Sequence, residues 1–499
     1  MNIVAEFRSR YAAALDKPCL IVPGNGVTTY GALDELSAKF AAALLAYGLQ
    51  PGERVVVQVE KSVGNVALYL GVLRAGGVYV PLNTSYTLSE LSYFIADAEP
   101  RIVVCRPEDK EAITAFAGKA VVEEMGQDAS RGFWARALKT AASADIAPRE
   151  PGDLAAIIYT SGTTGRSKGA MLSHGNLIDN TEVLHRIWGF GPQDVLVHAL
   201  PIFHAHGLFV ALHTSLLNAT PIIFLNAFDA ELVRSLLPQA TILMGVPTFY
   251  SRLAALPEFG PEDCRNIRVF ISGSAPLTEQ ASDAWTKRTG HRILERYGMS
   301  EALMITSNPL DGERIAGTVG YPLTGYEVRI ADAEGREQAR GDVGVIEIKG
   351  PSLFKGYWRM PEKTASEFRA DGFFITGDNG VMDESGRVSI VGRAKDLIIS
   401  GGYNIYPKEI EQLLDSIPGI AESAVIGAPH PEMGEGVVAI LVARAKPIAN
   451  EDLQAALSAS LARFKHPRRF YWVDDLPRNA MGKVQKAELR QRFIDAYVG

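Results

Sequence analysis

Cysteine is scarce in this chain, and its scarcity argues against two kinds of small stabilised domain. The 499 residues include three cysteines, Cys19, Cys105 and Cys264, which lie far apart and form no Cys-x-x-Cys pair. A disulfide framework or a structural zinc site is therefore not expected. Cys105 ends the apolar run 102–104, and we interpret it as a thiol buried in a strand.

Long hydrophobic runs and an excess of positive charge are also lacking. No uncharged apolar stretch reaches about 18 residues, so no membrane span is expected. The first residues carry Glu6, Arg8 and Arg10 without a long apolar core, so we do not expect a signal peptide, and a cytoplasmic enzyme is the default expectation. The net charge of −7 gives no general attraction to nucleic acid or to an anionic membrane.

What the chain does contain is the composition of a soluble globular protein of at least two domains. It is 47% hydrophobic and 21% charged. Short β-branched runs alternate with helical patterns, as in the expected strand 55–57, helix 65–74 and strand 78–80. This alternation predicts an α/β fold in which helices flank mostly parallel sheets.

The pattern of expected secondary structure changes after about residue 330. Short strands punctuated by glycine at 344–349, 373–376 and 388–392 predict a small antiparallel section. From about residue 400 a β-α-β pattern returns, which predicts a smaller α+β domain. We place the boundary so that one domain covers residues 1–394 and the other covers residues 395–499.

A polar, glycine-rich segment at 159–169 follows the apolar strand 155–158. It holds five serine or threonine hydroxyls, three glycines and Lys168. Glycines let backbone N–H groups turn toward an anion, and hydroxyls and a lysine add donors and charge, so the segment predicts a polyphosphate cradle. Lys168 comes three residues after Gly165, which does not match the P-loop pattern of many NTPases. The alternative is a flexible polar surface loop.

Several further motifs follow in order and cover nearly the whole chain. They are 203–208, 272–276, 295–301, 376–378, 392–396 and 477–483. Together with 159–169 they resemble the adenylate-forming superfamily, which contains acyl-CoA synthetases, firefly luciferase and the adenylation enzymes of peptide synthetases. The resemblance implies an N-terminal ATP- and acyl-binding domain, a mobile C-terminal domain, and activation of a carboxylic acid with ATP before its transfer to a thiol such as coenzyme A.

The resemblance also implies roles for individual residues. Lys483 is the catalytic lysine that bridges the carboxylate and the phosphate, and Lys395 lies at the hinge between the domains. Glu301, together with Thr163, holds Mg²⁺. Tyr297 packs on adenine, with Ser274, Ala275 and Pro276 as the opposite wall, while Asp378 and Arg393 meet the ribose. The full set expected to bind the nucleotide is Thr160, Ser161, Gly162, Thr163, Thr164, Gly165, Lys168, Gly273, Ser274, Ala275, Pro276, Glu295, Tyr297, Gly298, Met299, Ser300, Asp378, Arg393 and Lys395.

Two histidines, His204 and His206, follow the expected strand 195–200. In the family this segment lines the acyl pocket and the entrance for the thiol, so we expect His204 to take part in catalysis and both histidines to contact the acid. Two residues apart, they face the same way if the segment is extended. The alternative is that they are core histidines with satisfied hydrogen bonds.

The expected acyl pocket is polar and cationic. Arg252 and Arg296 join the two histidines in segments that long-chain and aryl ligases would need to be apolar. Because guanidinium groups pair bidentately with carboxylates, two arginines facing a small pocket suggest an acid with a second carboxylate. Runs such as 200–212, 245–253, 295–314 and 475–486 resemble malonyl-CoA synthetases. The resemblance therefore implies malonate, or methylmalonate, as the substrate.

Other assignments stay open from the sequence alone. Arg252 is a surface residue of a helix in one alternative, and Arg296 pairs with Glu295, Glu301 or another acid in another. A ligase for another short, fatty or aryl acid, or an enzyme that loads a carrier protein, fits the same motifs. Lys465, Arg468 and Arg469 either meet the phosphates of coenzyme A or form a solvated surface. A monomer or weak homo-oligomer is expected.

Overall fold

The computed structural model describes residues 1–142, 145–160, 167–400, 403–458, 461–479 and 482–497. The first part of the chain contains α1 Ile3–Tyr11, β1 Pro18–Val22, β2 Gly26–Thr29, α2 Tyr30–Ala46, β3 Arg54–Gln58, α3 Val63–Arg74, β4 Val78–Pro81, α4 Leu88–Ala98, β5 Ile102–Cys105, α5 Lys110–Phe116, β6 Val121–Glu124, α6 Gly132–Lys139, β7 Leu154–Thr160, β8 Lys168–Ser173 and α7 His174–Ile187.

The middle of the chain contains β9 Leu196–His198, a π-helical segment His206–Leu212, α8 His213–Leu217, β10 Ile222–Phe224, α9 Ala230–Leu236, β11 Ile242–Gly245, α10 Pro247–Ala255, β12 Val269–Ser272, α11 Glu279–Thr289, β13 Leu294–Met299, β14 Leu303–Ser307 and β15 Tyr321–Pro322.

The remaining elements are β16 Glu327–Ala331, β17 Gly344–Lys349, α12 Pro361–Ser366, β18 Phe374–Met382, β19 Val388–Arg393, β20 Ile398–Ser400, β21 Tyr403–Ile405, α13 Pro407–Ser416, β22 Ile420–His430, β23 Gly434–Ala443, α14 Asn450–Ser458, β24 Arg469–Val473 and α15 Lys486–Arg492. Short 3₁₀ turns lie at Pro107–Asp109, Leu237–Gln239, Pro261–Cys264, Ala394–Asp396 and Arg463–Lys465.

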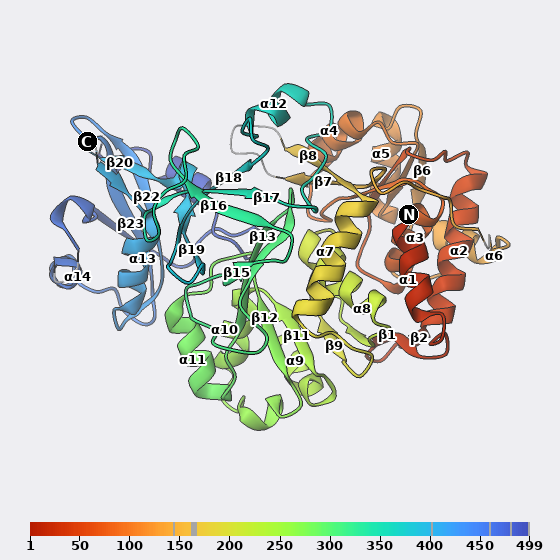
Figure 1. Ribbon diagram of the computed structural model, residues 1–499, viewed down its shortest axis with the longest axis horizontal. Helices are drawn as coiled ribbons and strands as arrows, with labels where there is room; N and C mark the ends of the chain where they lie inside the picture. Colours follow the sequence, from red (N-terminus) through yellow and green to blue (C-terminus); the bar gives the residue numbers. More distant parts are fainter. Residues whose placement is uncertain (143–144, 161–166, 401–402, 459–460, 480–481, 498–499) are drawn as a thin grey trace.

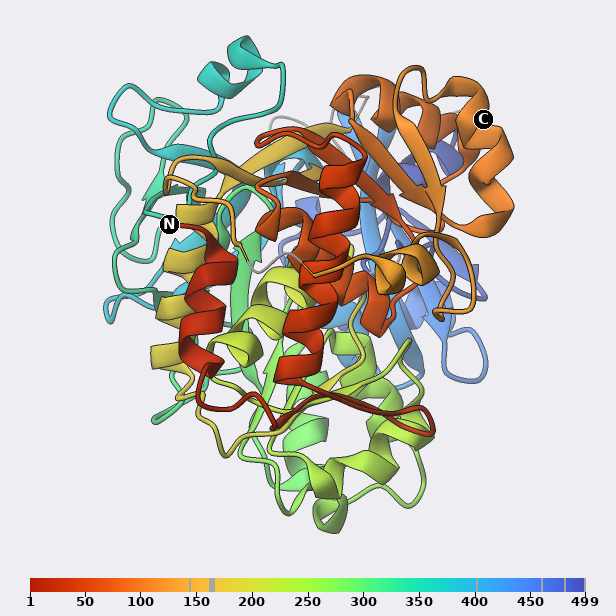
Figure 2. The same ribbon diagram turned by 90° about the vertical axis from the view of Figure 1, so that its right-hand side faces the viewer.

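Two large sheets form the body of the molecule. One has the strand order β6-β5-β3-β4-β7-β8, and the other has the order β15-β14-β13-β12-β11-β9-β10-β1-β2. The strands β3, β4, β5 and β6 pair in parallel, as do β9, β10, β11, β12 and β13. Runs such as Val55, Val56 and Val57 are buried, as expected for parallel strands covered on both faces. Figure 2 shows the N-terminal helices in front of these sheets.

Helix starts in this region follow from their capping residues. Ser62 accepts a hydrogen bond from the Asn65 backbone at the start of α3, and Thr87 with Glu90 forms a reciprocal capping box at the start of α4. Such caps satisfy backbone N–H groups that have no partner within the helix. They fix where the chain leaves β3 and β4 and turns back over the sheet.

The smaller antiparallel section and the C-terminal part complete the fold. The strands β16 to β19 form a four-stranded antiparallel sheet in sequence order. In the C-terminal sheet β22 and β23 pair antiparallel, and β24 joins β23 in parallel. In Figure 1 this blue part lies beside the green strands β16 to β19, at the opposite end from the red N-terminal helices.

The predicted α/β class, with a small antiparallel section and a smaller α+β part at the C-terminus, is confirmed. The expected helix 65–74 begins slightly earlier, at Val63 in α3. The end of β19 at Arg393 and the start of β20 at Ile398 bracket the predicted boundary between residues 394 and 395, which stays a prediction. No helix in the described ranges combines the length and hydrophobicity needed to cross a membrane.

Candidate active site

The predicted phosphate segment connects two paired strands. β7 and β8 are antiparallel, with Thr160 opposite Lys168 in the register. The described residues do not include Ser161, Gly162, Thr163, Thr164 and Gly165. The structure therefore describes only the two ends of the predicted cradle. The antiparallel pairing fixes where the chain leaves and re-enters the sheet.

A hydrogen-bonded network links Lys168 to Glu301. The Lys168 ammonium pairs with Glu367 at 3.1 Å and lies 4.1 Å from the centre of the Tyr357 ring. The Tyr357 hydroxyl lies 3.1 Å from a Glu301 carboxylate oxygen and 2.7 Å from a Glu367 oxygen. Burial is the main cause that raises the pKa of Glu301. The chain thus places a phosphate-segment lysine and the predicted metal ligand around one tyrosine.

The residues predicted to hold the nucleoside come together around Asp378. The Tyr297 hydroxyl donates to one Asp378 oxygen at 2.5 Å, and Arg393 pairs with the other oxygen at 2.7 Å. Asp378 is buried on β18, Tyr297 on β13, and Arg393 ends β19. Each oxygen of the Asp378 carboxylate thus has a donor. Tyr297 lies 81 positions before Asp378 in the chain, and Arg393 is opposite Asp378 on the neighbouring strand.

Lys483, near the C-terminus, lies close enough to Arg393 and Asp378 for their charges to act on it. Its backbone N–H donates to the Asn479 side chain at 3.0 Å, and the Asn479 N–H donates back to the Lys483 carbonyl at 3.0 Å. A Cβ added to the neighbouring Gly482 would lie 3.1 Å from the Thr248 hydroxyl, so this turn packs closely on the start of α10. Burial, and next the charge of Arg393, lower the pKa of Lys483 to about 8.

The two histidines of the acyl segment do not lie on an extended stretch of chain. His206 begins the π-helical segment and His204 lies before it, so the segment is not extended and the two rings do not point the same way by strand alternation. The backbone N–H of His206 donates to the Nδ1 of the His204 ring at 3.2 Å. The two ring nitrogens of His206 differ: Nδ1 lies 3.2 Å from the Ser274 hydroxyl, while Nε2 is buried and has no hydrogen-bond partner among the described residues.

Burial sets the charge of both histidines. It is the largest cause that lowers the pKa of His204 to about 4, and the positive charge of Arg296 lowers it further. The same two causes lower the pKa of His206. Both rings are therefore neutral near pH 7, and His206 offers its ring nitrogens as hydrogen-bonding groups rather than as a charge.

Arg296 is a buried cation without an acidic partner in the described part of the chain. It is 3% exposed on β13, and its Nε and one Nη atom lack any hydrogen-bond partner. Its guanidinium carbon lies 2.4 Å from the point where a Cβ on Gly273 would be, so only glycine leaves room for it. The next residue, Ser274, has a positive φ of 70°, which turns the backbone around the same group.

Arg252 does not share this environment. It lies in the last turn of α10 with an exposed side chain. The exposed side chain agrees with the alternative that Arg252 is a surface residue of a helix, because α10 presents Tyr250 and Leu253 to the core, and its contact with the acid stays a prediction. Of the two arginines predicted to contact the acid, Arg296 is the buried one.

The other predicted nucleotide residues border this site with different exposures. Glu295 is buried, accepts from the Leu277 N–H at 3.3 Å, and has its pKa raised to about 7 mainly by burial. Pro276 is exposed, and Lys395 is exposed on the 3₁₀ turn after Arg393. Half-buried residues are Ser274, Ala275, Gly298, Met299 and Ser300. Glu295 forms no ion pair with Arg296 among the described residues.

Sequence reasoning missed Tyr357 and Glu367. Both belong to the stretch 357–369, which lies in the connection between β17 and β18 and carries two acids with no distinguishing spacing. Only the folded contacts identify Glu367, among Glu362 and Glu367, as the acid that meets Lys168 and Tyr357.

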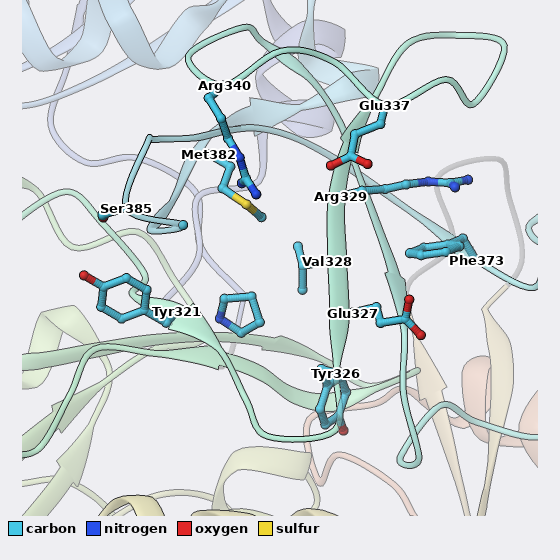
Figure 3. A pocket seen from close by; sticks show the side chains of 12 residues that line it. Tyr321, Tyr326, Glu327, Val328, Arg329, Glu337, Arg340, Phe373, Met382 and Ser385 are labelled. Atoms are coloured by element: carbon cyan, nitrogen blue, oxygen red, sulfur yellow. The ribbon is translucent and has the colours of Figure 1, made fainter.

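A surface pocket of about 640 Å³ lies elsewhere, on the four-stranded sheet (Figure 3). Arg329, Glu337, Arg340 and Phe373 are among its lining residues, and none of the predicted site residues lines it. Arg329 is already paired with Glu347 and Asp371. Groups of three or more metal-binding side chains are absent from the described residues.

Comparisons with known proteins agree with this arrangement. The AMP-binding enzyme family model matches residues 7–358, and the model of the AMP-binding enzyme C-terminal domain matches residues 409–483. The chain belongs to the AMP-binding enzyme family. It is 36% identical to a malonate–CoA ligase of Arabidopsis thaliana over 89% of this chain and 79% of that protein. It is 34% identical to a feruloyl-CoA synthase of an Amycolatopsis species over 94% and 95%.

Among solved structures, ATP-bound MatB from Rhodopseudomonas palustris is 51% identical, with a TM-score of 0.96 and all of both chains covered. The protein is an ATP-dependent, adenylate-forming acyl-CoA ligase that uses coenzyme A as co-substrate. The predicted resemblance to malonyl-CoA synthetases is confirmed by this set of relatives.

Proposed function

We propose that the protein is a malonate–CoA ligase, which converts malonate, ATP and coenzyme A into malonyl-CoA, AMP and diphosphate. The observation that carries the proposal is the buried, unpaired guanidinium of Arg296. Among the described residues its Nε and one Nη atom have no hydrogen-bond partner, and neither has the Nε2 of His206. The two side chains belong to one cluster, because the charge of Arg296 acts on His206, and because the Arg296 guanidinium packs on Gly273 while His206 contacts the neighbouring Ser274.

A buried cation without a partner is costly, and an anionic ligand removes that cost. The effective penalty for burying an ion is several kcal/mol, and a guanidinium fork matches the two oxygens of a carboxylate. A small acid with a carboxylate at each end satisfies Arg296 with one end and leaves the other end for activation. An acid with an apolar tail would leave Arg296 unpaired.

The reacting carboxylate lies between the acyl cluster and the phosphates in this proposal. One of its oxygens attacks the α-phosphorus of ATP, a new P–O bond forms, and the bond to diphosphate breaks. Because two anions must meet, the main task of the protein is to neutralise charge and hold the groups in line. Lys483 supplies a compact ammonium there, and Lys168 supplies another from the phosphate segment.

In the second step the sulfur of coenzyme A attacks the carbonyl carbon of the acyl-adenylate. The C–S bond forms as the C–O bond to AMP breaks, and the thiol proton passes to solvent. The basic residues Lys465, Arg468 and Arg469 remain candidates for the phosphates of coenzyme A, although Lys465 is already paired with Glu409 at 2.7 Å.

Glu301 fits a magnesium site. Its carboxylate is buried, and among the described residues its side chain is bonded to the neutral Tyr357 hydroxyl rather than to a cation, which leaves its charge available to a hard cation. When bound, Mg²⁺ would neutralise charge on the ATP phosphates. Thr163, the other predicted ligand, lies outside the described residues. The Tyr357 hydroxyl bonds to Glu301, while the Lys168 ammonium lies over the ring of the same tyrosine.

An aryl or fatty acid is the second candidate, because the feruloyl-CoA synthase relative is nearly as similar as the malonate–CoA ligase relative. The buried charge of Arg296 argues against it. An enzyme that loads a carrier protein remains an alternative for the second step.

The experiment is acid-dependent AMP release with and without coenzyme A. The acids compared are malonate, methylmalonate, succinate, acetate, octanoate and ferulate. We expect malonate to give the highest kcat/KM, with acetate and octanoate far below it. An apolar acid that outpaces malonate would overturn the substrate assignment, and ADP in place of AMP would overturn the reaction class.

A further inference from the structure

One buried ammonium, that of Lys61, takes no part in the reaction described above. Lys61 lies between β3 and α3, is 8% exposed, and forms no ion pair with a carboxylate in the described ranges. Burial lowers its pKa well below the ordinary value. Because an unpaired buried cation does not stabilise a fold, a structural role alone does not account for this residue.

The contacts of Lys61 lead to the acyl segment. Its ammonium donates to the His198 ring Nδ1 and to the His198 carbonyl, both at 2.9 Å, and lies 4.3 Å from the centre of the Phe224 ring. The other ring nitrogen of His198, Nε2, lies 2.9 Å from the Gly207 carbonyl oxygen. Since a carbonyl only accepts, His198 carries its proton on Nε2, and Nδ1 is the acceptor for Lys61.

Gly207 lies next to His206 in a tightly packed turn. A Cβ on Gly207 would lie 2.2 Å from the Pro201 carbonyl oxygen, so the chain has no room for a side chain there. The hydrogen bond from His198 therefore fixes the carbonyl of the residue that follows His206. The His206 N–H is held in turn by the His204 ring.

We propose that Lys61 is a positioning residue for the acid site, which acts through His198 and Gly207 on the orientation of His206. By donating to Nδ1, Lys61 holds His198 in the tautomer that can donate to Gly207. Without that donor, His198 can carry its proton on Nδ1, and its Nε2 lone pair then faces the Gly207 carbonyl. The segment 201–207 would shift, and the Nδ1 of His206 would leave its place beside the Ser274 hydroxyl.

A small cavity makes this shift possible. A space of about 90 Å³ is lined by Lys61, Asn65, Tyr79, Phe203 and Asn226, among others. It lies between α3 and β4 on one side and the segment 201–203 on the other. A turn that borders open space needs a specific hydrogen bond to hold one conformation, and the Lys61–His198 contact supplies it.

The test compares Lys61→Met with Arg74→Met. Arg74, the last residue of α3, is a matched control because it is also a buried cation, but it is bonded to Asp34 and Ser37 of α2. We expect K61M to raise the KM for the acid at least tenfold, with the KM for ATP changed less than twofold and with little loss of Tm. R74M should lower the Tm and leave both KM values unchanged.

Two further readouts do not depend on catalysis. Hydrogen exchange of the segment 201–208 should be faster in K61M than in the wild type, and unchanged in R74M apart from global unfolding. In the wild type, nitrogen NMR of labelled histidine should show His198 neutral with its proton on Nε2. If K61M fails to fold, this wild-type signal still decides the question.

An unchanged KM for the acid in K61M, equal increases in both KM values, or a wild-type His198 protonated on Nδ1 would overturn the positioning role. The proposal rests on the proposed acid site for its kinetic readout, so the assay uses whichever acid releases AMP fastest. Failure of malonate in the wild type would refute the substrate assignment, whereas failure of the K61M effect with a good acid would refute the role of Lys61.

Discussion

Arg252 on α10 and Arg296 on β13 are the same residue type, yet the fold gives them opposite environments. Both arginines stand out in the sequence, but the side of α10 that faces solvent is set by how Tyr250 and Leu253 pack in the core. The burial of Arg296 depends on Gly273, whose missing Cβ leaves space for the guanidinium. A sequence pattern does not report such a contact, so the sequence alone could not separate the buried arginine from the exposed one.

The single hydroxyl of Tyr357 contacts two acids of the site. Replacement by phenylalanine removes the hydroxyl that contacts Glu301 and Glu367, while the ring beside Lys168 is kept. We expect Y357F to raise the Mg²⁺ concentration needed for half-maximal adenylation several-fold, because Glu301 would lose the group that orients it.

The measurement is AMP release across a Mg²⁺ titration, together with Mn²⁺ binding followed by its paramagnetic signal in the presence of ATP. Tyr321→Phe is the control, because Tyr321 lines the surface pocket on the four-stranded sheet. Equal metal dependence in Y357F and the wild type would show that Tyr357 does not orient Glu301.

A buried acid in the antiparallel section allows a stability prediction. Glu347 is fully buried on β17 and accepts from Arg329 at 2.8 Å and from Arg369 at 2.7 Å. Removing one partner of a buried ion pair costs about 3–5 kcal/mol. We expect E347Q to lower the free energy of unfolding by about that amount, measured by urea denaturation.

Glu334→Gln is the matched control, because Glu334 pairs with Arg336 at the surface. It should change the free energy of unfolding by less than about 1 kcal/mol. A similar loss in both variants would mean that the Glu347 network does not stabilise the fold.

At the scale of the element, the turn that carries Lys483 determines the pH dependence of the first step. Burial lowers the pKa of this lysine to about 8, so the ammonium is present below that pH and is lost as the pH rises through it. The kcat/KM for acid-dependent adenylation should therefore fall above about pH 8, since this parameter reports the free enzyme.

The check is the pH profile of the pyrophosphate-forming step, set beside the reaction of pre-made malonyl-adenylate with coenzyme A. Only the first profile should fall, and Lys483→Ala should abolish the first reaction while sparing the second. Parallel profiles, or equal loss of both reactions in K483A, would contradict the role given to this turn.

Elements were predicted more securely than the contacts between them. The apolar runs that became β3, β5, β9 and β11 are visible as strands because parallel strands are buried on both faces. The π-helical segment at His206–Leu212 was not foreseen, because an apolar run such as 207–212 has no period that separates strand from irregular helix. The condition that the segment around His204 and His206 is extended is therefore not met.

At the scale of the whole molecule, the site joins residues from the N-terminal sheets, the antiparallel section and the C-terminal part. Lys168, Tyr297, Asp378 and Lys483 come from strands and turns that are hundreds of residues apart in some pairs. The order of the motifs predicted that they belong to one site. Their distances, and the network through Tyr357 and Glu367, required the fold.

Because the site draws on both parts of the chain, ligands should stabilise the molecule as a unit. A ligand that binds only the folded state adds RT ln(1 + [L]/Kd) to stability. We expect ATP with malonate to raise the Tm more than the sum of the two separate shifts, and we expect K483A to remove most of that excess.

Differential scanning fluorimetry with each ligand alone and with both gives this comparison, and Lys446→Ala, at an exposed position of the C-terminal part, is the control. Additive shifts in the wild type, or the same loss of excess in K446A, would contradict a site shared between the two parts.

The central claim is that the buried guanidinium of Arg296 holds the second carboxylate of the acid. The most direct measurement is the ratio of kcat/KM for malonate to kcat/KM for acetate in the wild type, Arg296→Met and Arg252→Met. We predict that the ratio falls at least about a hundredfold in R296M, equivalent to about 2.7 kcal/mol, and stays unchanged in R252M. A ratio that survives in R296M, or one that collapses equally in R252M, would contradict the account.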